Sequence, residues 1–289
     1  MKVSGFTFIR NAIRFDYPVC EAIRSILPVC DEVVVLVGNS EDETRKLIEN
    51  IGSDKIRIVD SVWNDLLREG GRVLADETNK ALSKISADSD WAFYIQADEV
   101  LHERFLPVVS ETMVKWKDHP AVEGLLFDYR HFYGSYDYTA DSSKWYRREV
   151  RIIRNDATIK SFRDAQGFQK NGRPLRVKET GAKIYHYGWV KPPDRQQEKQ
   201  KNFHRLWHSD DWVRKNIEKG NEFDYSVIDS LAKFSETHPA IMQQRIAEKN
   251  WQFSFDPSQK KLSFKSRFKM NLEKWTGWRI GEYRNYKII

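Results

Sequence analysis

Two adjacent acids, Asp98 and Glu99, follow an apolar segment, residues 91–95, that has the composition of a buried strand. A carboxylate at the C-terminal end of a strand lies where open α/β sheets bind their ligands. Carboxylate oxygens are ligands that Mg²⁺ and Mn²⁺ prefer, and such sites often carry a diphosphate. The pair therefore predicts a divalent-metal and diphosphate site, and an ordinary surface turn is the alternative interpretation.

The segments before these acids alternate between strand-like and helix-like patterns. The predicted strands are residues 2–9, 32–37 and 55–59, and the predicted helices are residues 19–27, 40–51 and 72–85. Ser40 and Glu43 have the spacing of a capping box at the start of the second helix. Short apolar strands that alternate with amphipathic helices are typical of βαβ units, so we expect a mostly parallel sheet covered by helices on both faces.

This order resembles the nucleotide-binding half of the family 2-type glycosyltransferases, which have the GT-A fold. The matching segments are residues 8–11, 40–44, 79–82 and 91–99, followed downstream by 151–154 and 186–189. The resemblance implies an α/β, GT-A-like catalytic domain over residues 1–190, with a mostly parallel nucleotide-binding sheet flanked by helices. It also implies an inverting, metal-dependent glycosyltransferase that moves a sugar from a nucleotide-sugar donor to a glycan or lipid-linked acceptor.

The resemblance assigns roles to individual residues. Asp98 and His186 would bind the Mn²⁺ or Mg²⁺ ion, and Asp164 would be the base that takes the proton of the acceptor hydroxyl. The residues implied in binding the nucleotide sugar are Arg10, Asn11, Asn39, Asp60, Asn79 and Gln96. Two of the roles have structural alternatives, since His186 could be a hydrogen-bonded core residue and Asp164 could pair with Arg163 or Arg154.

Two positions depart from the family pattern. Asn39 stands near the place of an acid that usually contacts the base or ribose, and Gln96 stands at the first acid of the usual Asp-x-Asp motif. These departures motivate a second hypothesis, a GT-A-like binding protein that has lost catalysis.

An aromatic segment in the middle of the chain could form the acceptor side. Residues 122–129 have the pattern of a strand, and residues 131–138 combine aromatic rings with hydroxyl groups. Sugars have apolar faces and polar rims, so such a segment could form a sugar-binding platform. A loop that covers the edge of the sheet is the alternative.

The pattern changes after Pro192–Pro193. Helices are predicted at residues 194–208, 210–217, 227–234 and 239–251, so residues 191–289 are expected to form a helical appendage packed on the catalytic domain. Its last part, residues 258–289, is a basic aromatic tail with nine Lys or Arg residues against Glu273 and Glu282. The tail could dock on an anionic membrane surface or an acidic glycan, or its aromatic rings could pack on the main domain. No recognised RNA- or DNA-binding motif accompanies it, so nucleic acid is not an expected partner.

The composition is that of an ordered protein, with 40% hydrophobic residues and 13% aromatic residues in 289. No apolar run reaches the length of a membrane-spanning helix, and Met1-Lys2 leads into a strand rather than into a signal peptide. We therefore expect a cytoplasmic protein, peripheral to the inner face of the membrane if the tail docks there. Cys20 and Cys30 flank a predicted helix, about 15 Å apart, so a disulfide is not expected.

Overall fold

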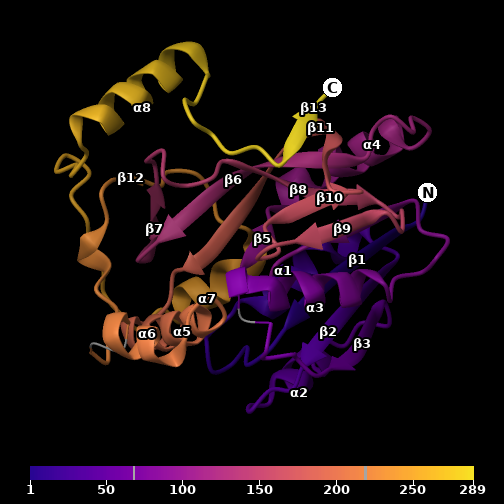
Figure 1. The fold of residues 1–289 in the computed structure, drawn as a ribbon, viewed down its shortest axis with the longest axis horizontal. Coiled ribbons are helices and arrows are strands. Elements are labelled where there is room, and N and C mark those ends of the chain that lie inside the picture. Colours follow the sequence, from indigo (N-terminus) through magenta and orange to yellow (C-terminus); the bar gives the residue numbers. More distant parts are fainter. Residues whose placement is uncertain (68, 218–219) are drawn as a thin grey trace.

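The computed structural model describes residues 1–67, 69–217 and 220–289. Its centre is a 13-stranded mixed sheet with the main order β3-β2-β1-β4-β8-β6-β11-β10-β9 (Figure 1). Helices flank the sheet, so the chain is an α/β protein, as the sequence predicts.

The N-terminal half follows the predicted alternation. Its elements are β1 (Val3–Ile9), α1 (Val19–Ile26), β2 (Glu32–Gly38), α2 (Thr44–Glu49), β3 (Ile56–Ser61), α3 (Arg72–Leu82) and β4 (Trp91–Tyr94). β1 lies between β2 and β4 and runs parallel to both, and β3 runs parallel to β2. The C-terminal ends of these strands therefore meet at one edge, which is where the loops that follow β1, β2 and β4 gather.

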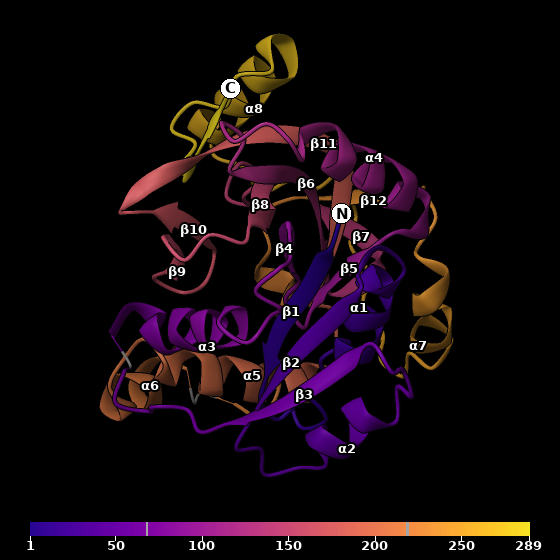
Figure 2. The same cartoon turned by 90° about the vertical axis from the view of Figure 1, so that its right-hand side faces the viewer.

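The two faces of this parallel part carry different helices, as Figure 2 shows. Val33 and Val35 of β2 pack with Ile23 of α1 on one face, where α2 and α4 (Leu106–Trp116) also lie. Val34 and Leu36 point to the other face and pack with Ala81 of α3. Successive residues of a strand point to opposite faces, so a strand that is buried on both sides reads as an unbroken apolar run.

The second half of the sheet is mostly antiparallel. Its strands are β5 (Glu99–Leu101), β6 (Gly124–Tyr133), β7 (Ser135–Ala140), β8 (Arg148–Arg154), β9 (Ile159–Phe162), β10 (Gly167–Lys170) and β11 (Arg173–Trp189). β8 is antiparallel to both β4 and β6, whereas the long β11 runs parallel to β6 and antiparallel to β5. These pairings bring the C-terminal part of β11 close to the end of β4.

The C-terminal part contains both helices and strands. Its elements are α5 (Pro193–Arg205), α6 (Asp210–Asn216), β12 (Leu231–Lys233), α7 (Gln243–Ala247), α8 (Phe264–Thr276) and β13 (Tyr286–Ile288). The helix expected over residues 227–234 is wrong, because Leu231 is buried and β12 instead pairs with the edge strand β7. β13 adds in parallel to β11, so the last residues of the chain join the main sheet.

The predicted capping box is also wrong. Ser40 Oγ accepts a hydrogen bond from the backbone N–H of Asn11 at 3.0 Å, and Glu43 makes no side-chain cap. Asp42 Oδ1 accepts from the N–H of Thr44 at 3.0 Å instead. Ser40 thus ties the loop after β2 to the loop after β1. The two cysteines are free thiols, as expected.

Candidate functional site

The two adjacent acids that follow β4 have different surroundings. Glu99 is fully buried and forms a two-pronged ion pair with Arg151, with distances of 2.9 Å to Nε and 2.8 Å to Nη2. The hydroxyl of Tyr129 donates a third hydrogen bond to Glu99 at 2.7 Å. Asp98 is also buried, but it faces the edge of the sheet, where β11 and α5 approach. Of these two acids, Asp98 is therefore the candidate for contact with a ligand.

Asp98 lies against His186 of β11 and Lys199 of α5. His186 Nε2 is 3.7 Å from Asp98 Oδ1, and Lys199 Nζ donates to Asp98 Oδ2 at 3.1 Å. Backbone pairing brings His186 close to Asp98, because β11 pairs with β5 and the N–H of Tyr187 donates to the carbonyl of Asp98 at 2.8 Å. The predicted metal residues Asp98 and His186 are thus neighbours, although they are 88 positions apart in the chain.

Gly188 leaves the space between these two side chains open. A Cβ atom at this position would lie 2.6 Å from Asp98 Oδ2 and 2.8 Å from His186 Nε2, which is closer than real Cβ contacts. Lys199 also contacts the backbone at Gly188, since its ammonium donates to the Gly188 carbonyl at 2.8 Å. Any larger residue would push the acid and the imidazole apart.

Hydrogen bonds assign the tautomers of two buried histidines. His131 Nε2 lies 2.7 Å from the carbonyl of Tyr146, which can only accept, so Nε2 carries the proton. In a neutral ring the other nitrogen of His131 then accepts, and its partner at 3.2 Å, His186 Nδ1, must donate. His186 Nε2 is left with a free lone pair that faces the Asp98 carboxylate. Two acceptors that face each other across 3.7 Å are the arrangement that a bound cation would satisfy.

The charges in this cluster favour the protonation states that this arrangement needs. Burial lowers the pKa of His131 well below its usual value, and burial also lowers the pKa of His186 although Asp98 opposes the shift. Burial would raise the pKa of Asp98, but neighbouring positive charge, that of Lys199 above all, outweighs burial and holds that pKa well below its usual range. At neutral pH the cluster therefore contains an ionised carboxylate and two neutral imidazoles.

Two further groups of α5 and its N-terminal flank are buried beside this cluster. Lys191 is fully buried and donates to the carbonyls of Phe15 and Asp16 at 2.7 and 3.2 Å. Gln196 lies one turn before Lys199 and is fully buried, and neither end of its amide has a hydrogen-bond partner among the residues that the structure describes. Buried polar groups are nearly always paired, so the amide of Gln196 is an exception within the described part of the chain.

A cavity of about 540 Å³ opens between the loop after β1 and α5. Arg10, Asn11 and Arg14 line it from the loop, and Gln197, Lys201 and Arg205 are among the residues that line it from α5. Glu198 of α5 closes one side through its ion pair with Arg14 at 2.5 Å. Since α5 carries both Lys199 and the cavity wall, the acid cluster and the cavity share this helix.

Two of the predicted nucleotide-binding residues, Arg10 and Asn11, lie in the cavity. The guanidinium of Arg10 pairs with Asp65 at 3.0 Å and lies 5.4 Å from the ring centre of Trp63. Asn11 has a positive φ of 55° and is buried, and its Oδ1 accepts from the N–H of Glu41 at 2.7 Å. Asn is among the non-glycine residues that adopt this left-handed backbone conformation most often. Arg10 is thus presented to the cavity and Asn11 holds the loop that presents it.

Gln96 and Asp164 lie at the opposite side of the strand end. The amide of Gln96 donates to the carbonyl of Ala165 at 3.3 Å, so it contacts the turn that carries Asp164. Asp164 is half-buried and packs beside the N-terminus of α3, where a Cβ on Gly71 would lie 3.0 Å from Asp164 Cβ. Burial raises the pKa of Asp164. Its proposed ion-pair partners are engaged elsewhere, because Arg154 donates to carbonyls at the end of α4 and Arg163 lies against Tyr283.

The other three predicted residues do not line the cavity. Both ends of the Asn79 amide bond to the backbone of Ser161, at 2.8 and 3.0 Å, which ties α3 to β9. Asp60 is exposed at the end of β3 and pairs with Arg45 at 2.5 Å. Asn39 is exposed after β2 and accepts from the N–H of Trp63 at 3.3 Å.

Several residues of the cluster carried no signal in the sequence. His131 reaches His186 only through the pairing of β6 with β11, and Lys199 belongs to a polar helix in which it resembles its neighbours. Gly188 lies two positions after His186 in the same motif. A glycine so close to a candidate metal-binding residue is a local sequence signal that another group approaches the backbone there.

Comparisons with known proteins add little to this site. No family model matches the chain, and no curated protein matches it. Among solved structures, the chain is similar to S. aureus TarS 1-349 in complex with UDP, with 16% identity over 76% of this chain and 68% of that one and a TM-score of 0.42. It is also similar to glucosyl-3-phosphoglycerate synthase from Mycobacterium tuberculosis in complex with Mn²⁺, UDP and phosphoglyceric acid, with 20% identity over 46% and 43% of the two chains and a TM-score of 0.31.

The chain spans 39% of the longer TarS structure. Likenesses at this identity and TM-score establish neither a family nor an activity, so a function for this chain has to rest on the geometry of its own site.

Proposed function

We propose that the protein is a GT-A-type glycosyltransferase that moves a sugar from a nucleotide-sugar donor to a glycan or lipid-linked acceptor. The observation that carries the proposal is the cluster at the end of β4, where the Asp98 carboxylate and the bare Nε2 of His186 face each other across 3.7 Å. A cavity of about 540 Å³, lined by four Arg or Lys and four Asp or Glu residues, lies along the same helix, α5. The Arg and Lys side chains that line it are the groups that would contact the phosphates of a nucleoside diphosphate.

Asp98 and His186 fit the Mn²⁺ or Mg²⁺ ion that such enzymes use. One carboxylate oxygen and one neutral imidazole nitrogen are acceptable ligands for Mn²⁺, and Gly188 leaves room between them. Within residues 1–67, 69–217 and 220–289 no group of three or more His, Cys, Asp and Glu side chains could hold a metal. Diphosphate oxygens and water would therefore complete the shell, as is common for Mg²⁺. When bound, the ion would neutralise charge on the departing diphosphate.

The protein's own cations would share this task. Arg10 and Arg14 line the cavity beside the expected diphosphate, and Lys199 lies against Asp98. Positive groups that are fixed before the reaction stabilise a leaving group as its negative charge develops. The proposed boundary at residue 190 therefore does not divide the site, since α5 of the C-terminal part supplies Lys199 and one wall of the cavity.

Asp164 is the proposed base. In an inverting transfer the acceptor oxygen forms a bond to the anomeric carbon while the bond to the diphosphate breaks on the opposite face, and the hydroxyl proton passes to the carboxylate. Burial raises the pKa of Asp164, which makes the ionised group a better proton acceptor. Gln96 contacts the turn of Asp164, so the turn lies next to the strand end that carries Asp98.

The proposal includes a cytoplasmic location, at the inner face of the membrane if the acceptor is lipid-linked. The alternative is a binding protein of the same fold without catalysis. One observation favours it, because the ammonium of Lys199 already lies 3.1 Å from Asp98 and could take the place of the metal.

Calorimetry with a panel of UDP-, GDP- and dTDP-sugars, each with and without Mn²⁺, tests the proposal. We expect one donor to bind in a Mn²⁺-dependent manner and Asp98→Asn to abolish that dependence. Asp60→Asn is the matched control, because Asp60 is an exposed acid at the end of a neighbouring strand. Binding that ignores Mn²⁺ and survives in Asp98→Asn would remove the metal from the proposal. Mn²⁺-dependent binding without sugar transfer or donor hydrolysis would favour the inactive binding protein.

A further inference from the structure

The helix α8 presents a row of large aromatic side chains to solvent. Phe264, Phe268 and Trp275 are 88%, 60% and 92% exposed. They are four and seven residues apart, so they lie within about 40° of one another around the helix axis. Figure 1 shows α8, in yellow, standing away from the sheet and from the other helices. The sequence left open whether these rings pack on the main domain, and on α8 they do not.

Basic residues flank the aromatic row on both sides. Lys265 lies on one side, and Arg267 and Lys274 lie on the other, and all three are exposed. None of these three makes an ion pair or a side-chain hydrogen bond with any residue in the described part of the chain. The opposite face of the helix contains Ser266, Met270 and Glu273 and is half-buried. The helix is therefore amphipathic with its apolar face turned outward.

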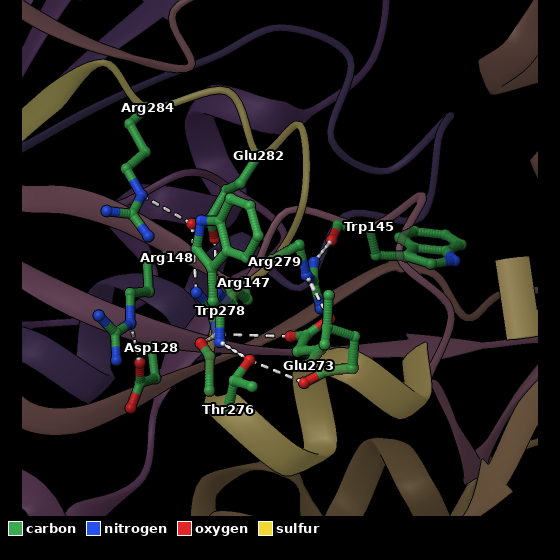
Figure 3. A network of polar contacts seen from close by, with 12 residues as sticks. Asp128, Trp145, Arg147, Arg148, Glu273, Thr276, Trp278, Arg279, Glu282 and Arg284 are labelled. Atoms are coloured by element: carbon green, nitrogen blue, oxygen red, sulfur yellow. Dashed lines mark hydrogen bonds and ion pairs between the residues drawn. The ribbon is translucent and has the colours of Figure 1, made fainter. Parts of the chain in front are cut away.

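A polar network fixes the C-terminal end of α8 to the body, as Figure 3 shows. Arg147 pairs with Glu282 at 2.5 Å and with Glu273 at 3.3 Å, and Arg279 pairs with Glu273 at 2.8 Å. Arg279 also donates to the carbonyl of Trp145 at 2.6 Å. Glu273 and Glu282 are the two acids of the tail, and both are used here. The outward face of α8 is left with cations and aromatic rings.

We propose that α8 docks the protein on an anionic membrane surface. A helix with Phe and Trp on one face and Lys or Arg on its flanks lies in the membrane interface, with the rings at the boundary of the acyl chains and the cations at the headgroups. No helix in the described part of the chain is both long and apolar enough to cross a bilayer, so α8 would lie on the surface. The unpaired cations select a negatively charged surface.

A second copy of the chain is a poorer occupant of this face. A two-fold contact between two α8 helices would place the same patch on both sides. Lys265, Arg267 and Lys274 of each copy would then lie near those of the other, and like charges across an interface are repulsive. Anionic lipid pairs with these cations instead of repelling them.

Flotation of the full-length chain with lipid vesicles tests the proposal. We expect binding to vesicles of phosphatidylcholine with about one third phosphatidylglycerol, little binding to phosphatidylcholine alone, and release in about 0.5 M NaCl. The double variant Phe268→Ser/Trp275→Ser and the double variant Lys265→Glu/Lys274→Glu should each bind at least about tenfold more weakly. Val227→Ser and Arg24→Glu are the matched controls, because both residues are exposed and lie outside α8.

Three outcomes would overturn the proposal. One is the absence of binding to anionic vesicles at low salt, and another is binding by both double variants that equals the binding of the unmodified protein. The third is a dimer in light scattering that Phe268→Ser/Trp275→Ser converts to a monomer, which would assign the face to self-association. All substituted side chains are exposed, so circular dichroism and thermal unfolding should match those of the unmodified protein, which excludes misfolding as the cause of a loss.

Discussion

Glu99 and Asp98 are consecutive acids, but their carboxylates have different hydrogen-bond and ion-pair partners. Glu99 is fully buried, and Arg151 donates hydrogen bonds to both of its carboxylate oxygens. Tyr129 donates a further hydrogen bond to Glu99. Asp98 has one oxygen on Lys199, while the other faces a nitrogen lone pair of His186. Both groups are buried, so burial alone does not distinguish an acid with a structural role from the proposed metal ligand.

The difference lies in the hydrogen-bonding capacity that the surroundings leave over. Around Glu99, donors and acceptors match. Around Asp98, two acceptors face each other, and the buried amide of Gln196 has no partner in the described chain. Protein interiors rarely leave such groups unpaired, so this unused hydrogen-bonding capacity supports the proposal that a ligand binds at Asp98.

The largest effect that follows from this comparison is the loss of stability when Glu99 is neutralised. Glu99→Gln leaves the fully buried guanidinium of Arg151 without a counter-charge, so the free energy of unfolding should fall by about 3–5 kcal/mol. Urea unfolding measures it. The matched control is Glu179→Gln, an exposed acid paired with Arg148 at 2.6 Å, which should cost less than about 1 kcal/mol. Equal losses in the two variants would contradict the structural role of Glu99.

A third buried acid, Glu149 of β8, extends the comparison to pH. It accepts from Gln166 at 2.8 Å and from Asn285 at 3.1 Å, and burial raises its pKa to about 7. A raised pKa means that the folded state binds the proton more tightly than the unfolded state. The protonation of Glu149 therefore contributes fully to the free energy of unfolding below the pKa of the unfolded state, near 4.5. This contribution is lost as the pH rises through 7.

The expected loss is about 3 kcal/mol at most between pH 4.5 and pH 7. Urea unfolding across this range should show a flatter decline for Glu149→Gln than for the unmodified protein. Parallel curves for the two proteins would show that Glu149 does not titrate in this window.

Unlike Glu99 and Asp98, Asp164 forms no ion pair within the described part of the chain, and Glu149 likewise has neutral hydrogen-bond partners. If it is the base, Asp164→Asn should lower kcat by at least about 10²-fold with little change in donor affinity. Single-turnover transfer assays and donor calorimetry together measure this split. Near-normal turnover would return Asp164 to a structural role, with Glu179 and Asp128 as the next candidates.

The sequence predicted the parts of the molecule that local patterns determine. β1, β2, β3 and β4 and their helices follow from apolar runs and helical spacing, and the end of β4 follows from the acids themselves. β12 was mistaken for a helix because its strand conformation depends on pairing with β7, which no local pattern encodes.

The sequence predicted only some residues of the candidate site, for the same reason. His186 and Asp98 were predicted from their motifs, whereas His131 and Lys199 reach them through sheet register and helix packing. The exposed face of α8 could be seen as amphipathic in the sequence, but the direction in which it points depends on the Arg147 network at its base.

The smallest expected effect is the stability change in Asp98→Asn, and it decides whether the comparison holds. The amide oxygen of Asn can still accept from Lys199 Nζ, and Lys199 keeps its bond to the Gly188 carbonyl. Lys199 also has a flexible side chain, unlike the planar guanidinium of the enclosed Arg151. We therefore expect a loss of about 1–2 kcal/mol, smaller than that of Glu99→Gln. Urea unfolding of Asp98→Asn, alone and combined with Lys199→Gln, measures the loss and the part that Lys199 causes. A loss as large as that of Glu99→Gln, recovered in the double variant, would make Asp98–Lys199 a structural ion pair and would remove the physical basis for a metal at Asp98.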